Sequence, residues 1–174
     1  ALIASALLKV NPTAIIIPFA NKVKLVDVVS PKNDVITNAT NIKAMVNGGT
    51  DCAAPLEYLN AGKIKADLVI FVSDNQSWLN ETNKNGTSKM VEWDKFKTVN
   101  PKSKMICIDI VPNTTSQVNP SPEILQVGGW SDRCFDTMAD FYANGNRNVD
   151  SWIEEIMLYQ PKERRGAVDV EGGW

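Results

Sequence analysis

The sequence predicts an α/β fold with a mainly parallel sheet, and two observations carry that prediction. Short apolar runs typical of buried strands span residues 66–73 (ADLVIFVS), 104–111 (KMICIDIV) and 124–127 (ILQV). Segments with apolar residues at helical spacing lie between and around these runs. Strands that alternate with helices need crossover connections, and such connections favour parallel pairing.

The first thirty residues predict a helix and a hairpin. Residues 1–10 (ALIASALLKV) have helical composition, with apolar residues on most faces and no N-cap, as in the second half of a buried helix. The β-branched run 13–19 (TAIIIPF) predicts a buried strand, and the alternating run 23–29 (VKLVDVV) predicts a half-exposed edge strand. The link between them is so short that they would form an antiparallel hairpin.

The other elements follow from periodicity and from residues that begin or end helices. Helices are predicted over 34–46, from Thr50-Asp51 through 61, over 89–99, from Ser131-Asp132 through 142, and over 148–159. Residues 76–88 and 112–122 are polar or proline-rich and predict loops. We therefore expect one domain over residues 1–160 and a frayed, charged tail over 161–174.

Composition excludes several classes of function. The chain has 174 residues, 44% of them hydrophobic, and a net charge of -2, which suits one ordinary globular domain and argues against a basic surface that grips nucleic acid throughout. It has no histidine, so the usual general base and Ser-His triads are absent. Its three cysteines form no C-x-x-C pair and are expected to be reduced and buried. No apolar run approaches the roughly 20 residues of a membrane span, and we expect a cytoplasmic protein.

Two polar segments are predicted to meet at the carboxyl edge of the sheet. Thr50 follows Gly48-Gly49, which let the backbone turn sharply, and Asp74 directly follows the 66–73 strand. Open α/β sheets bind ligands beyond the carboxyl ends of their strands. A hydroxyl and a carboxylate at this edge are hard oxygen ligands of the kind that Mg²⁺ prefers.

Helix capping and turn formation offer a simpler explanation of the same residues. Thr50 or Asp51 after a glycine pair is a usual helix N-cap, and Asp74-Asn75 after a strand is a common turn. The Gly-Gly-Thr loop is also weak as a phosphate-binding loop, because it lacks the lysine-hydroxyl ending. From composition alone the capping explanation has the greater weight.

A resemblance over most of the chain changes that balance. In order, the segments GGTDCAAPLEYLN, ADLVIFVSDNQSW, MVEWDKFKTVNPKSKMICIDIVPN and ILQVGGWSDRCFDTMADF resemble the von Willebrand factor A domain of the Ro autoantigen (TROVE) family of RNA-binding proteins, in particular its bacterial members. The resemblance implies a three-layer, Rossmann-like fold with one antiparallel edge strand. It also implies a metal-ion-dependent adhesion site in which Thr50 and Asp74 are metal ligands.

One part of the family pattern is missing from this sequence. The Asp-x-Ser-x-Ser turn that forms the first metal loop occurs nowhere, and neither does the central strand that precedes it and should lie between residues 13–19 and 66–73. A sheet without its central strand would leave two apolar strand edges unpaired. The resemblance therefore implies a partner, either a second polypeptide or a missing N-terminal segment, that supplies the central strand. Binding of Mg²⁺ or another divalent cation would depend on the first metal loop that this partner carries.

The resemblance also implies a function. We expect a non-catalytic binding module of a small-RNA ribonucleoprotein involved in RNA quality control, whose metal bridges to an acidic group of a protein ligand. Two alternatives stay open at this point: a protein-protein adhesion module with no RNA role, and a metal-dependent phosphoryl hydrolase. The hydrolase is weakened by the missing general base.

Several neighbours of the metal ligands are candidates for supporting roles. Asp51, Ser73 and Asn75 flank the ligands and are expected to orient metal-bound water or contact the ligand. Trp78 follows the strand end on the ligand side and is a candidate for a partner contact. Asp109 lies within a predicted strand, and the sequence assigns it no role.

Overall fold

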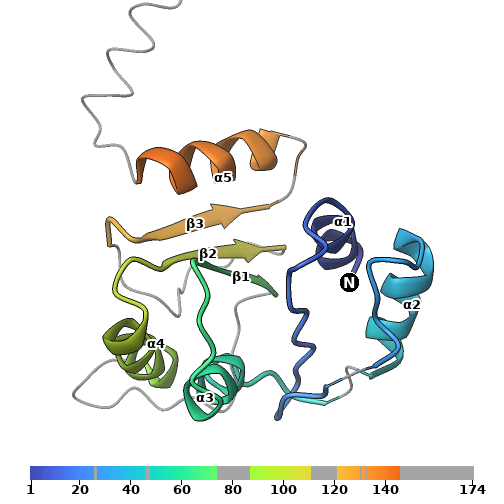
Figure 1. The fold of residues 1–174 in the computed structure, drawn as a ribbon, viewed down its shortest axis with the longest axis horizontal. Helices are drawn as coiled ribbons and strands as arrows, with labels where there is room; N and C mark the ends of the chain where they lie inside the picture. The colour runs from blue at the N-terminus through green and yellow to red at the C-terminus, as the bar shows by residue number, and fades with distance from the viewer. Residues whose placement is uncertain are drawn as a thin grey trace, which may run out of the picture.

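Three parallel strands form the centre of the computed structural model, in the order β1-β2-β3 (Figure 1). The structure describes residues 1–25, 27–45, 48–73, 87–110, 121–129, 131 and 133–145. The elements in chain order are α1 (Leu2–Val10), α2 (Val35–Met45), α3 (Ala54–Ala61), β1 (Leu68–Ser73), α4 (Ser88–Val99), β2 (Lys104–Asp109), β3 (Ile124–Gly128) and α5 (Arg133–Asn144). The helix predicted over 148–159 and the predicted tail lie outside the described residues.

The strand register brings the carboxyl ends of all three strands to one edge. β1 pairs with β2 from Leu68↔Lys104 to Ser73↔Asp109, and β2 pairs with β3 up to Asp109↔Gly128. The predicted α/β class with a parallel sheet is confirmed for these strands. Each of them lies within two residues of its predicted bounds at either end.

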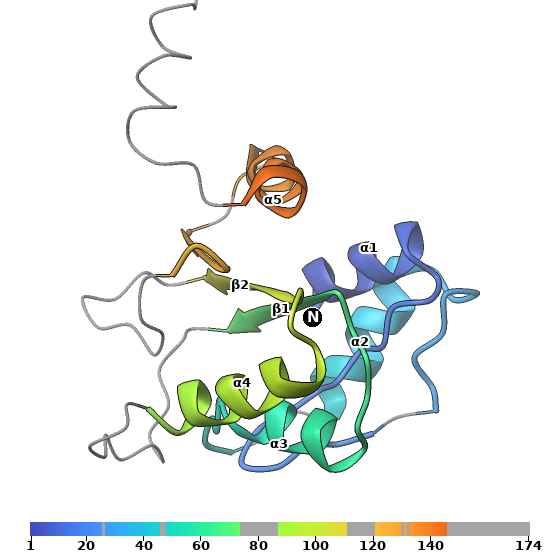
Figure 2. The ribbon, with the colours of Figure 1, turned by 60° about the vertical axis from the view of Figure 1, so that its left-hand side comes forward.

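Helices cover both faces of the sheet, which gives three layers (Figure 2). On one face, alternate strand residues pack with α3 and α4; this core contains Leu56, Leu59, Phe71, Trp93, Phe96, Met105, Cys107 and Ile124. On the other face, the remaining strand residues pack with α5; this core contains Ile106, Ile108, Met138 and Phe141. The alternation arises because successive side chains of a strand point to opposite faces.

The pair α1 and α2 lies on the β1 side of the molecule (Figures 1 and 2), where Ile3 of α1 packs against the core on the α5 face. Lys9 of α1 connects this helix to the loop before α2, because its ammonium donates to the carbonyls of Pro31 and Asn33 at 3.2 Å each. The Asp34 carboxylate caps α2 by accepting from the Thr37 amide at 2.7 Å. Hydrogen bonds from the Thr37 hydroxyl and amide lower the pKa of Asp34.

The hairpin predicted over residues 13–29 does not form, and this prediction was wrong for the described residues. Residues 14–18 belong to no described strand, and the only described link between the two runs is a single antiparallel bridge, Phe19↔Val23. Ile15 is 60% exposed. A β-branched run forms a strand only where a neighbour accepts its backbone hydrogen bonds, and no described strand lies beside this one.

No helix in the described part of the chain is long and apolar enough to cross a membrane.

Candidate functional site

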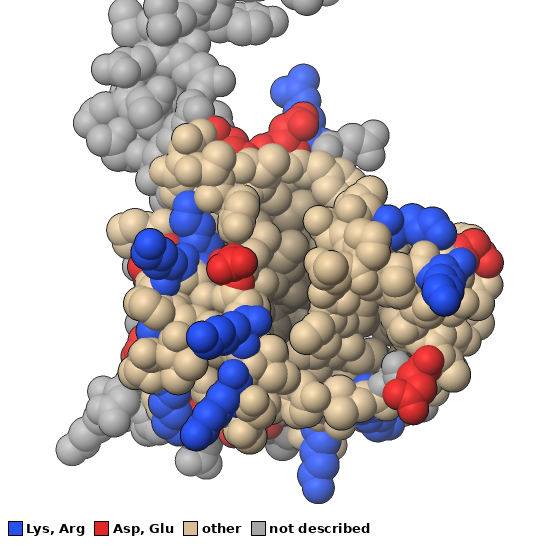
Figure 3. Space-filling view, viewed as in Figure 1, with Lys and Arg blue, Asp and Glu red and all other residues tan. Residues whose placement is uncertain are grey.

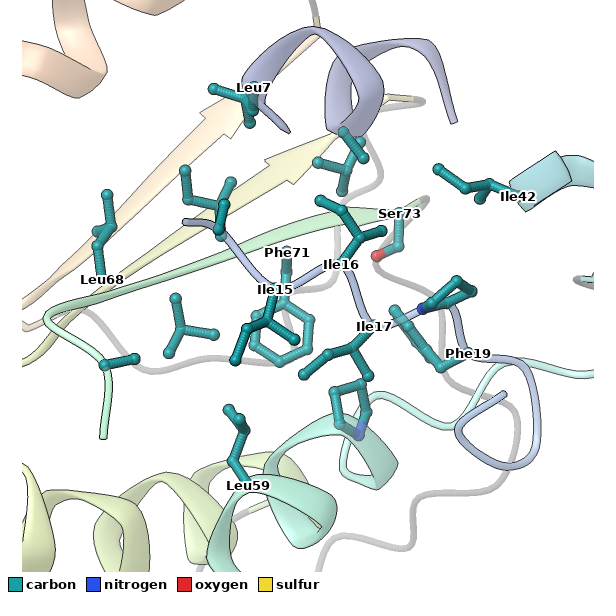
Figure 4. A pocket seen from close by; sticks show the side chains of 18 of the residues that line it. Leu7, Ile15, Ile16, Ile17, Phe19, Ile42, Leu59, Leu68, Phe71 and Ser73 are labelled. Atoms are coloured by element: carbon teal, nitrogen blue, oxygen red, sulfur yellow. The ribbon is translucent and has the colours of Figure 1, made fainter. Parts of the chain in front are cut away.

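A deep groove separates the exposed edge of β1 from the extended segment 13–19. Its volume is about 850 Å³, and it shows as a hollow in the middle of the molecule (Figure 3). Residues of β1 and the isoleucines 15–17 form its two long sides, with side chains from both directed towards the space between them (Figure 4). The first and third helices also contribute, through Leu7 and Leu59. The lining is therefore largely apolar.

The groove exposes one edge of the β1 backbone. The Asp67 and Ser73 carbonyls accept from the Lys104 and Ile110 amides on the β2 side, both at 3.0 Å. Backbone groups of successive strand residues point to opposite edges, so those of residues 68, 70 and 72 point into the groove. Nothing in the described ranges hydrogen-bonds to them. A strand edge of this kind is able to accept another strand.

The loop that carries Thr50 is held by the turn that follows segment 13–19. Gly48 has a φ of 108°, which favours glycine, and the Asp51 amide donates to the Ala20 carbonyl at 2.8 Å. A Cβ at Gly49 would lie only 2.8 Å from the Asn21 side-chain oxygen. The loop and the turn therefore fit against each other closely, a contact that the sequence did not predict.

Thr50 is not the N-cap of α3. The helix begins at Ala54 with Ala53 as its N-cap, so the predicted start at Thr50-Asp51 was wrong. The Asp51 carboxylate instead accepts from the Ala53 amide at 2.9 Å, which closes a local turn two residues long. The turn formed by Asp51 places the helix three residues later and separates Thr50 from it.

The structure brings two of the predicted site residues to the same groove. Thr50 and Ser73 both line it, and Ser73 lies at its end where β1 stops (Figure 4). Asp51 lies next to Thr50 but uses its carboxylate locally. The other predicted residues, Asp74, Asn75 and Trp78, lie outside the described residues.

Asp109 provides a carboxylate at this edge, a candidate metal-binding group to which the sequence assigned no role. It is the last residue of β2, in register with Ser73, and its Oδ1 atom is buried without a hydrogen-bond partner. An orphaned carboxylate oxygen in register with the hydroxyl-bearing Ser73 suits a hard cation. The described residues contain no group of three or more acidic, cysteine or histidine side chains, so a complete metal site needs ligands from elsewhere.

A buried lysine lies two residue pairs further from the edge, on the same face as Asp109. The Lys89 ammonium is 3.2 Å from the Cys107 sulfur and 3.8 Å from the centre of the Phe71 ring. Burial raises the pKa of the Cys107 thiol, and the neighbouring ammonium partly opposes that rise. The thiol therefore stays protonated and serves as a buried, unreactive group.

Comparison with known proteins identifies the family. The model of the Ro60 vWA domain matches residues 1–142. The chain belongs to the Ro60 vWA domain family. The resemblance in the sequence to Ro-type von Willebrand factor A domains is thereby confirmed.

A solved structure shows the same fold. The Ro (Rsr) protein of Deinococcus radiodurans superposes with a TM-score of 0.66 at 20% sequence identity, over 81% of this chain and 28% of that one. The Ro60-type chain described here thus spans little more than a quarter of the length of that protein. Among curated proteins, none matches the chain described here.

Proposed function

We propose that this chain is a non-catalytic binding module of a Ro-type ribonucleoprotein that holds a divalent cation at the carboxyl edge of its sheet. The groove beside β1 is the observation that carries the proposal. It runs along a free strand edge, and both Thr50 and Ser73 line it. Whatever fills the groove therefore reaches the position where the metal ligands are expected.

The proposed occupant is an extended strand supplied from outside the 174 residues, by a second polypeptide or by a preceding segment. A strand that pairs with all of β1 has six residues and a length of about 20 Å. With strand spacing near 4.8 Å and a sheet thickness near 10 Å, it would occupy roughly 950 Å³. The groove volume of about 850 Å³ is of the same order as the volume of one strand.

The two sides of the groove support the same occupant. The backbone groups of residues 68, 70 and 72 face it from β1, and those of residues 15–17 have no described partner. A strand placed between them would satisfy both sets of groups. It would also turn segment 13–19 into the strand that the sequence predicts. We call this chain together with the supplied strand the complete assembly.

The cation in this proposal is Mg²⁺ or another divalent ion. Thr50 and Asp74 would be its ligands from this chain, with Asp51, Ser73 and Asn75 near them and Trp78 beside the ligand. The polypeptide that supplies the strand would contribute the remaining metal loop. When bound, the cation would bridge to an acidic group of a protein ligand, since hard cations favour carboxylate oxygens.

RNA binding is proposed for the complete assembly rather than for this chain. Family membership supports an association with RNA. We propose that this RNA is a small noncoding RNA and that the assembly acts in RNA quality control in the cytoplasm. The chain itself has a net charge of -2 and no dense cluster of basic residues, so it is poorly suited to hold RNA alone. Two other functions are tested against this one: an adhesion module without RNA, and a metal-dependent phosphoryl hydrolase.

Metal binding is tested by titration calorimetry of Mg²⁺ into the complete assembly. We expect one site, and we expect Thr50→Ala to weaken it about 10-fold or more, as loss of a metal contact does. Thr98→Ala is the matched control. Thr98 is an exposed threonine near the end of α4, and it is not one of the predicted site residues. If the complete assembly binds no Mg²⁺, the metal role of Thr50 and Asp74 is wrong.

RNA association is tested by purifying the complete assembly from cells and sequencing the RNA that co-purifies. Enrichment of a defined small RNA supports the proposal. A preparation that binds Mg²⁺ and a protein but no RNA would favour the adhesion module. Hydrolysis of p-nitrophenyl phosphate that depends on Mg²⁺ and is lost in Thr50→Ala would favour the hydrolase.

The supplied strand is tested by expressing the 174 residues alone. An unfilled apolar groove and a free strand edge are expected to cause aggregation or a non-cooperative thermal transition. A cooperative, monomeric melt of the chain alone would show that the sheet needs no further strand.

A further inference from the structure

Asp109 carries a carboxylate oxygen that the described structure leaves unexplained. Its Oδ1 is buried and has no hydrogen-bond partner. Leaving a buried acceptor unpaired costs about 1–3 kcal/mol, and more when the group is charged. A native chain keeps such a group where something outside the chain satisfies it, such as an ion or a tightly held water.

The register fixes where this oxygen lies. Asp109 pairs with Ser73 on one side and with Gly128 on the other. Paired residues of neighbouring strands present their side chains on the same face, so the Asp109 carboxylate and the Ser73 hydroxyl lie side by side, about 5 Å apart at Cα. Gly128 has no side chain, and this leaves room next to the carboxylate.

No cation of the described ranges neutralises Asp109. The ion pairs found there are Lys95–Glu92 and Lys97–Glu123. The Lys89 ammonium is on the same face but contacts the Cys107 sulfur and the Phe71 ring, two residue pairs further from the edge. The carboxylate therefore lies at the sheet edge with one oxygen available to a ligand of positive charge.

We infer that Asp109 is an additional contact of the divalent cation, through a metal-bound water or directly. The inference rests on the proposed function, and it extends that function by adding a carboxylate from β2. Asp109 would lie on the side of the cation away from the groove, because it is separated from the groove by β1. It would also raise the negative charge of the site, which favours Mg²⁺ over monovalent ions.

Titration calorimetry of Mg²⁺ into the complete assembly tests the inference. We expect Asp109→Asn to raise the dissociation constant about 10- to 100-fold, the usual effect of losing an outer contact. Asp94→Asn is the control, because Asp94 is an exposed aspartate in the middle of α4; it should leave the constant unchanged. Equal binding by Asp109→Asn and the wild type would overturn the inference while the proposed metal site stands. A wild type that binds no Mg²⁺ would overturn both.

Thermal unfolding separates a metal contact from a structural role. Without Mg²⁺, Asp109→Asn should melt at or above the wild-type temperature, because it removes an unpaired buried charge. With saturating Mg²⁺, it should gain less than the wild type does. A variant that loses the same amount in both conditions would show that Asp109 acts only in packing. If Asp109→Asn does not fold, Asp109→Ser provides the same comparison with a smaller polar side chain.

Discussion

The two edges of β1 differ more than any other two regions of the described molecule. On one edge, β1 forms a full parallel ladder with β2, whose residues Met105 to Ile108 are at most 2% exposed. On the other edge lies the groove, with Ile15 at 60% exposure across it. Both edges face isoleucine-rich segments of similar composition. The difference shows that a β-branched run becomes a strand only where a neighbour pairs with it.

The largest expected effect lies on the paired side. Ile106 is fully buried between β1 and β3, and Ile106→Ala should reduce the free energy of unfolding of the complete assembly by about 2–5 kcal/mol because it leaves a cavity. Ile36→Ala in α2, where the side chain is 66% exposed, should change it by less than about 0.5 kcal/mol. Urea denaturation measures both. Similar losses for the two variants would mean that the packed side is not where the stability resides.

The groove side is examined by amide hydrogen exchange of β1 in the complete assembly. The amides of residues 69, 71 and 73 face β2 and should be protected in any case. The amides of residues 70 and 72 should be equally protected once a strand fills the groove. If they exchange roughly 100-fold faster than their neighbours, corresponding to a free edge, the groove is not a strand acceptor.

The strands β1, β2 and β3 were predictable because each is a short apolar run that pairs with another described strand. Segment 13–19 is similarly rich in β-branched residues, but it forms no strand because no described strand lies beside it. Thr50 and Asp74 were predicted at one edge from a glycine turn and a strand end, and their role as metal ligands came from the family resemblance. Asp109 was missed because its position next to Ser73 depends on the register between two strands, which composition does not encode.

A smaller effect is expected where the Thr50 loop meets the turn after segment 13–19. A Cβ at Gly49 would come within 2.8 Å of the Asn21 side-chain oxygen, so Gly49→Ala should cost about 1 kcal/mol of unfolding free energy. The cost stays low because the end of the Asn21 side chain is able to move. It should disappear in the double variant Gly49→Ala with Asn21→Ala, and Asn21→Ala alone is the control. A double variant that is as unstable as Gly49→Ala would place the strain elsewhere in the loop.

The smallest expected effect is a pH dependence on the paired side. Because burial raises the pKa of the Cys107 thiol in the folded protein, the unfolded chain loses this proton first, near its ordinary pKa of 9.0. The contribution of the thiol to stability is therefore fully present below pH 9 and is lost as the pH rises from there through the raised folded pKa. In Cys107→Ala the fall in unfolding free energy above pH 9 should be shallower than in the wild type. The difference between the two slopes is the quantity to measure, because lysines and tyrosines titrate in both proteins. Equal slopes would mean that the thiol ionises as readily in the fold as in the unfolded chain, and that the paired side admits water at Cys107.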